Sequence, residues 1–189
     1  MKHFVLAAAL VVACAAPAVC ADATYRADPP HSSATFTVTH LGISHVSGVI
    51  PMKVATLTIP EGSNIPSAAQ ASFDPAGIDT RNGDRDADLR SPHFFDVASD
   101  PKMEFVSTNV AATDATHFAM TGNLSMHGQT HPVTLDGQFL GRMTDGRGHT
   151  RVGYSAKATI DRTQWGMTYG PIVAGNTVDI DVEIEAIKQ

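Results

Sequence analysis

The sequence predicts an all-β fold, an antiparallel β-barrel of about eight strands with one short helix near residues 82–90. Apolar and polar residues alternate through most of the chain after Tyr25, as is typical of half-buried strands. Short turns such as residues 145–148 separate neighbouring segments and favour hairpins. No helical period of useful length follows Pro101. Strands therefore determine the fold class.

The segment 33–40 shows the alternation most clearly, because Ala34, Phe36 and Val38 fall on one face and threonines fall on the other. Further strands are predicted over residues 46–52, 54–59, 68–73, 102–110, 117–127, 132–143, 149–161 and 176–187. Closing these strands into a barrel removes exposed edges, and a barrel of about eight strands holds either side chains or one small ligand. A two-sheet sandwich fits the same periodicity and stays open as the alternative.

The stretch from Arg81 to Phe105 interrupts the alternation. Charged residues are dense in its first half, and residues 84–89 contain no β-branched side chain. A short helix is predicted to begin near Asn82 and to end at Ser91-Pro92, because proline does not continue a helix. This is the one non-strand element that the sequence predicts.

The amino terminus predicts a secretory signal peptide over residues 1–21, followed by a single domain over residues 22–189. Lys2 precedes an apolar run, and small residues lead to a cleavage site after Ala21. The run is short and broken by Pro17, so a stable membrane span is the weaker alternative. A lipobox ending at Cys14 leaves a lipoprotein as a second alternative. Both cysteines lie before the cleavage site, so the mature domain depends on its core rather than on disulfides.

The chain is acidic, with 13 Lys and Arg against 19 Asp and Glu and a formal net charge of −6. An acidic chain without a basic run argues against nucleic acid and anionic membrane surfaces as partners. The alternation also collects an almost uncharged inward face: Phe36, Val38, Phe105, Phe118, Met120, Leu124, Met126, Val133, Leu135, Phe139, Val178, Ile180, Val182 and Ile184. Periodicity alone does not decide whether this face is a filled core or a cavity for an elongated apolar ligand.

Four passages together resemble one family. They are Arg85-Asp-x-x-Leu-Arg-Ser-x-x-Phe-Phe-Asp96 with Pro101-x-x-x-Phe105, the segment from His31 to Gly42, the segment from Gly122 to Leu135, and the alternation from Asn176 to Glu185. In this order they are similar to the YceI-like family of periplasmic polyisoprenoid-binding proteins. The resemblance covers nearly the whole mature chain.

The resemblance implies an extended, lipocalin-like barrel in the periplasm whose internal channel holds a polyprenyl chain or the tail of a quinone. Such a protein is a carrier or buffer, not an enzyme, and needs no cofactor besides the bound isoprenoid. One position departs from the family, which often has histidine where Asp88 stands. Trp165 is a milder departure, because an aromatic ring is kept where phenylalanine is expected.

Two groups of residues are predicted to bind the ligand. The apolar channel is assigned to Phe36, Val38, Leu89, Phe94, Phe95, Phe105, Met120, Leu124, Met126, Leu135, Phe139 and Trp165. The polar mouth is assigned to Arg85 and Arg90, which can meet a quinone oxygen or a phosphate. The alternative is structural: Arg85 pairs with a carboxylate, and the two adjacent phenylalanines plug one end of the barrel.

No catalytic or metal site is predicted. His127 and His131 flank a tight turn, but HExxH and carboxylates at ligand spacing are absent. The sequence has no G-x-S-x-G nucleophile elbow, and Asp84, Asp86 and Asp88 lack the glycine and terminal glutamate of a calcium loop. An accessory protein or enzyme acting on such a lipid, and a structural barrel with a filled core, stay open as alternatives. The identity of the isoprenoid and a homodimer also stay open.

Overall fold

The computed structural model describes residues 22–189. The predicted signal peptide and the lipobox at Cys14 lie outside this part of the chain. Along it, no helix has the length and apolarity needed to cross a membrane. The elements are β1 (Asp22–Ala27), η1 (Pro29–His31), β2 (Ser33–His40), β3 (Ser44–Val49), β4 (Met52–Pro60), β5 (Ala68–Phe73), η2 (Pro75–Gly77), α1 (Gly83–Arg90), β6 (Met103–Ala112), β7 (His117–Met126), β8 (Gln129–Thr144), β9 (Thr150–Asp161), η3 (Arg162–Trp165) and β10 (Ala174–Lys188).

Eight of the strands close into an antiparallel barrel in the order β1-β4-β5-β6-β7-β8-β9-β10, and β10 returns to β1 through the pair Tyr25–Lys188. The predicted all-β barrel with one short helix is therefore confirmed, and the two-sheet sandwich is excluded. β1 is the strand that the sequence analysis missed, although Ala23, Tyr25 and Ala27 alternate in it. Without β1 the barrel has no closing strand.

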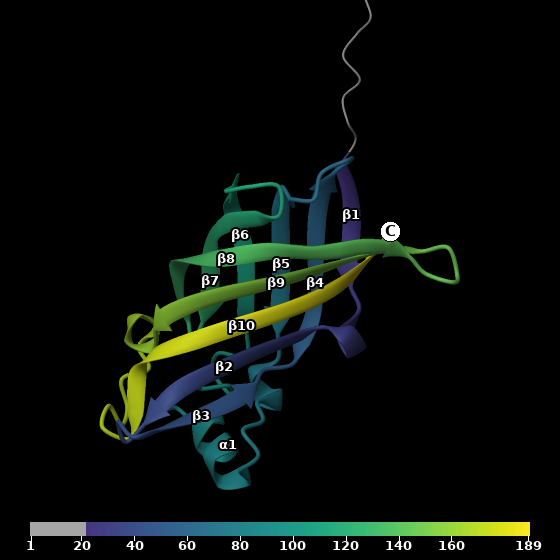
Figure 1. Cartoon of the computed structure of the whole chain (residues 1–189). Helices are drawn as coiled ribbons and strands as arrows, with labels where there is room; N and C mark the ends of the chain where they lie inside the picture. The colour runs from purple at the N-terminus through teal and green to yellow at the C-terminus, as the bar shows by residue number, and fades with distance from the viewer. Residues whose placement is uncertain (1–21) are drawn as a thin grey trace, which may run out of the picture.

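Strand β10 is long enough to have two neighbours on one side. Its last residues pair with β1, whereas residues 178–183 pair with β2, and β2 pairs with β3. The β2–β3 hairpin therefore extends the sheet beyond the closed barrel. Figure 1 shows this extension at the lower left, with α1 below it.

The turn between β7 and β8 consists of His127 and Gly128, with φ angles of 49° and 66°. Positive φ at both central residues is typical of a type I′ turn, whose twist suits a two-residue hairpin. The predicted strand 117–127 extended one residue into this turn. The predicted strand 46–52 combined the end of β3 with the start of β4, which the structure separates at Ile50-Pro51.

Three phenylalanine rings on the inner face of the sheet lie over glycines of the neighbouring strand: Phe36 over Gly48, Phe105 over Gly122 and Phe118 over Gly137. A methyl group built at any of these glycines would overlap the ring beside it. The rings can therefore lie flat against the barrel wall, where larger neighbours would force them inward. This arrangement leaves room along the middle of the barrel.

The two ends of the barrel differ. At one end, near the β8–β9 hairpin, Tyr154 packs against Phe118 and Phe139 with ring centroids 6.0 and 5.5 Å away. We call this the filled end. At the other, residues 81–101 with α1, the β2–β3 turn and residues 166–174 surround the interior, and we call it the open end.

Candidate functional site: an apolar cavity in the barrel

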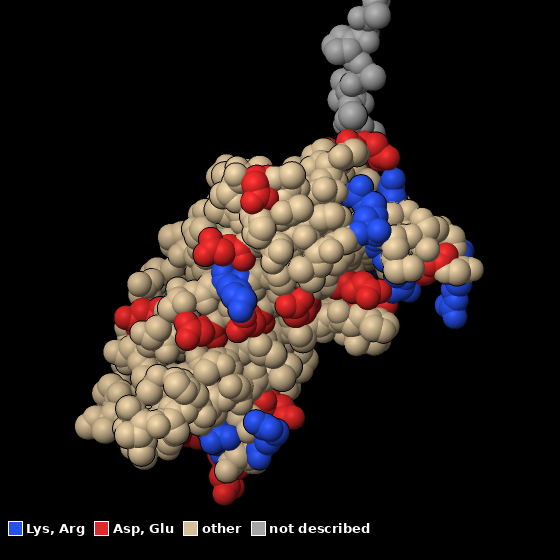
Figure 2. Space-filling model, viewed as in Figure 1, with Lys and Arg blue, Asp and Glu red and all other residues tan. Residues whose placement is uncertain are grey.

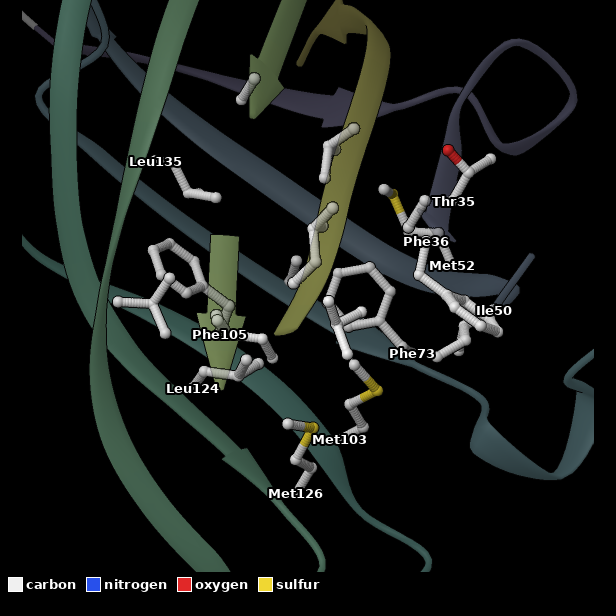
Figure 3. A pocket seen from close by; sticks show the side chains of 18 of the residues that line it. Thr35, Phe36, Ile50, Met52, Phe73, Met103, Phe105, Leu124, Met126 and Leu135 are labelled. Atoms are coloured by element: carbon white, nitrogen blue, oxygen red, sulfur yellow. The ribbon is translucent and has the colours of Figure 1, made fainter. Parts of the chain in front are cut away.

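A cavity of about 280 Å³ lies inside the barrel and extends to the open end. Its volume is near the lower limit for small-molecule sites. Barrel strands β4 to β10 contribute to it, together with the β2–β3 hairpin and α1. Figure 3 shows Phe105, Leu124 and Met126 pointing into this space, with Phe73 and Met103 nearby.

The alternation of the strands explains the lining. In β7, Phe118, Met120, Leu124 and Met126 are buried and recur at every second residue, interrupted only by Gly122, whose place the Phe105 ring covers. Residues two apart on a strand point to the same face. The alternation of apolar and polar residues that predicts the strands therefore also makes the cavity lining apolar.

Most residues assigned to the apolar channel line this cavity: Phe36, Val38, Leu89, Phe94, Phe95, Phe105, Met120, Leu124, Met126 and Leu135. Arg85 and Asp88 also reach it. The structure places these side chains around one space, and their role as ligand contacts stays a prediction.

Three assigned residues lie elsewhere. Phe139 points inward but packs at the filled end, against Tyr154 and beneath Arg142. Trp165 is buried behind the wall, where its indole Nε1 donates to the carbonyl of Leu124 over 2.9 Å. Arg90 ends α1 and is absent from the lining. Sequence parity placed Phe139 correctly on the inner face, but it could not say how far along the barrel the hollow extends.

Arg85 is held by a structural network. Its Nε donates to Oγ1 of Thr80 over 2.7 Å, and its Nη2 donates to the carbonyl of the same residue over 2.8 Å. Asp86 accepts the hydroxyl and the backbone N–H of Thr80. These hydrogen bonds, from the Thr80 side chain first, hold the pKa of Asp86 below its ordinary value, and the charges of Arg90 and Arg85 add to the effect. Asn82 caps the same helix by accepting the N–H of Arg85 over 3.0 Å.

Arg162 is a charged lining residue that was not assigned from the sequence. It is 4% exposed, and its guanidinium donates to the carbonyls of Met167, Ala174 and Gly175. Burial lowers its pKa from the ordinary value. Among residues 22–189, no carboxylate lies at salt-bridge distance from Arg162. Its hydrogen bonds to the three carbonyls hold residues 166–176 in place, and we call this arrangement the clamp. Its carbon Cζ also lies 5.5 Å from the centre of the Phe94 ring.

A stack of rings connects α1 to the same segment. His93 and Tyr169 are parallel, with ring centroids 3.9 Å apart, and Phe94 meets Tyr169 edge-on at 5.9 Å. His93 donates from Nδ1 to Asp88 over 2.8 Å. Asp88 therefore orients a ring at the edge of the cavity.

Tyr154 contributes a polar side chain to the lining, next to Phe118 and Phe139 of the filled end. Its hydroxyl donates to the carbonyl of Asn64 over 2.7 Å. Burial raises its pKa to about 12, so the phenol stays protonated at neutral pH.

The histidines singled out in the sequence have structural contacts. His127 donates from Nδ1 to the carbonyl of Trp165 over 2.6 Å, and His131 packs edge-on against the same indole. A group with metal-like spacing lies instead at the filled end, where Asp28, His31 and Glu185 come together. Arg151 donates to both carboxylates of that group and already supplies a positive charge.

Several lining residues were not assigned from the sequence, among them Val46, Ile50, Met52, Leu57, Phe73, Met103 and Val173. The alternation of β4 was a usable signal for Leu57. Val173 had none, because it precedes β10 in a segment without periodicity.

Comparison with known proteins agrees with the fold and the motifs. Residues 25–186 match the YceI-like domain. A UPF0312 protein of Pseudomonas putida is 32% identical over 171 residues, covering 88% of each chain. One of Pectobacterium atrosepticum is 29% identical over 184 residues, covering 97% of this chain and 95% of the relative.

Solved structures share the fold at low identity. BcnA of Burkholderia cenocepacia has a TM-score of 0.74 at 16% identity, covering 84% of this chain and 98% of that one. A polyisoprenoid binding domain from Saccharophagus degradans, implicated in plant cell wall breakdown, has a TM-score of 0.64 at 15% identity and covers 87% and 98%. The chain belongs to the YceI-like family.

Proposed function

We propose that this protein binds an isoprenoid lipid, either a polyprenyl chain or the tail of a quinone, in the barrel cavity, and that it acts as a periplasmic carrier or buffer. The observation that carries the proposal is the apolar cavity inside a closed barrel. If the barrel interior served only as a core, larger side chains in this space would stabilise the protein, because an empty cavity lacks van der Waals contacts.

The lining suits a long hydrocarbon. Each buried methylene contributes roughly 0.8 kcal/mol, so about ten buried carbon groups contribute about 8 kcal/mol, comparable with the cost of association. Methionine side chains in the lining, such as Met103 and Met126, adapt to irregular apolar shapes. The Saccharophagus neighbour, described as a polyisoprenoid binding domain, supports the same ligand class.

The polar groups of the lining support binding rather than catalysis. Arg85 and Arg162 donate to protein oxygens, Tyr154 donates to a backbone carbonyl, and Asp88 accepts from His93. Each of these bonds holds an element of the fold in place. Binding a lipid also requires no bond to be made or broken.

Mass spectrometry of the lipid content tests this proposal. The full-length chain is expressed in a bacterial host, purified from the periplasmic fraction and extracted with organic solvent. The expected result is a stoichiometric prenyl lipid. Folded protein that repeatedly yields no lipid, and that takes up no added polyprenol or ubiquinone, would refute the proposal.

A pair of variants localises the ligand. Leu89→Asp places a charge at the cavity wall and should abolish lipid retention, because a buried unpaired carboxylate is costly beside hydrocarbon. Leu140→Asp makes the same change at an exposed residue outside the cavity and should leave retention unchanged. If folded Leu89→Asp protein keeps its lipid, α1 does not line the binding site.

The cellular location can be tested separately from lipid binding. The predicted signal peptide supports the periplasm, and the mass of the mature protein distinguishes a chain that begins at Asp22 from one lipidated at Cys14.

A further inference from the structure

Two segments at the open end expose large apolar side chains. The β2–β3 turn carries Leu41 and Ile43, and the segment before β10 carries Tyr169, Ile172 and Val173. Ile43 and Ile172 are 85% and 82% exposed. We call these five residues the apolar tip. Single exposed apolar residues are ordinary, whereas a group of them marks an interaction surface.

The two segments lie side by side. The backbone N–H of Leu41 donates to the carbonyl of Val173 over 3.1 Å, and His40 pairs with Ala174. Tyr169 stacks on His93, which connects the apolar tip to the chain after α1. The five side chains therefore belong to one surface, although about 130 residues separate the two segments in sequence.

The apolar tip lacks charge. Neither residues 41–52 nor residues 166–178 contain Asp, Glu, Lys or Arg. Figure 2 shows the consequence, because the lower-left end of the face in view is free of red and blue, while α1 below it and the strands above it carry both colours. Such a surface neither repels nor requires charged lipids, although the chain as a whole is acidic.

The apolar tip is also continuous with the cavity. Val173 is 52% exposed and yet lines the cavity, together with His40 and Ala174. The cavity therefore reaches the surface next to the exposed apolar side chains. A hydrocarbon ligand leaving there would otherwise enter water.

From this placement we propose that the apolar tip docks the protein on the surface of a neutral phospholipid bilayer, with Ile43 and Ile172 inserted below the headgroups. The proposal goes beyond lipid binding in the cavity, because the docking surface would act whether or not the cavity is occupied. Tyrosine is favoured at the headgroup level, which suits Tyr169. Five side chains are few for a stable interface with a second copy of this chain, which uses about 20–30 residues a side.

Flotation with phosphatidylcholine vesicles tests the proposal. The purified protein should float with the vesicles, and added salt should not release it, because apolar insertion rather than charge attraction holds it. The double variant Ile43→Glu and Ile172→Glu should bind at least about tenfold more weakly. The double variant Leu140→Glu and Met143→Glu is the matched control, because both residues are exposed, apolar and outside the apolar tip.

Three outcomes would overturn the proposal: wild-type protein that does not float, tip variants that float like wild type, or control variants that lose binding equally. Light scattering tests whether the apolar tip instead binds a second copy of this chain. A wild-type dimer that becomes monomeric in the tip variant, without vesicle binding in either, would assign the apolar tip to a second copy. Mass spectrometry on the same samples separates this test from that of the lipid ligand, since tip variants should keep their lipid.

Discussion

The filled end and the open end of the barrel both contain aromatic rings and an arginine, but these side chains are packed differently at the two ends. At the filled end, Tyr154, Phe118 and Phe139 pack ring against ring, and Arg151 ties β9 to Asp28, Asp145 and Glu185. At the open end, aromatic rings and a buried cation border a space instead of filling it. The difference teaches that similar side chains can either pack against one another or surround a space, depending on which segments the fold brings beside them.

Phenylalanine truncation should separate the two ends most clearly. Phe118→Ala removes a ring that is 5% exposed and should lower the free energy of unfolding by about 3–5 kcal/mol. Phe94→Ala at the open end removes a ring that is only half-buried and should cost less, about 1–2 kcal/mol. Denaturant unfolding of both variants checks the order, and equal losses would contradict the division into two ends.

Arg162→Lys tests the clamp at the open end. An ammonium group cannot reproduce the fork that serves three carbonyls, so at least one of them loses its partner. We expect a loss of about 2 kcal/mol in unfolding free energy. Hydrogen exchange should also accelerate at the amides of Leu41 and Ala174, which depend on residues 166–174. Unchanged exchange there would show that the clamp does not hold this segment.

Gly137→Ala tests the filled end by adding one methyl group. The methyl would overlap the Phe118 ring and should cost about 1–3 kcal/mol through overpacking. Gly141→Ala on the same strand meets no atom within 4 Å and should change stability by no more than about 0.5 kcal/mol. If both substitutions behave alike in thermal unfolding, the ring does not lie against Gly137 in solution.

Lowering the pH should destabilise the open end of the barrel, because it protonates the carboxylate of Asp86. Its pKa is lowered in the folded protein, so its contribution to stability is present above the ordinary value of 3.8 and is lost as pH falls through the folded-state value. Asp86→Asn removes this contribution. The difference in unfolding free energy between wild type and variant should therefore shrink below that pH, and a constant difference would contradict the assignment.

The sequence predicted the secondary-structure elements better than it predicted the extent of the cavity. Alternation and the cap at Asn82 were enough for the barrel and α1, whereas β1 was missed because six residues beside a predicted signal peptide give a short pattern. Phe105 and Phe139 share the same inward parity, yet only Phe105 borders the cavity. Arg162 was missed because a charged residue after a strand predicts a surface position, and its burial depends on carbonyls that only the folded loop brings together.

The three phenylalanine and glycine pairs have a consequence for how the chain folds. A strand that slips by two residues keeps its apolar side chains facing inward, so the binary pattern does not oppose that error. The slip would, however, place Phe36, Phe105 or Phe118 over a residue that has a side chain instead of over glycine. A misaligned strand would therefore lose this ring packing, so the glycines that leave room inside the barrel also favour the native register.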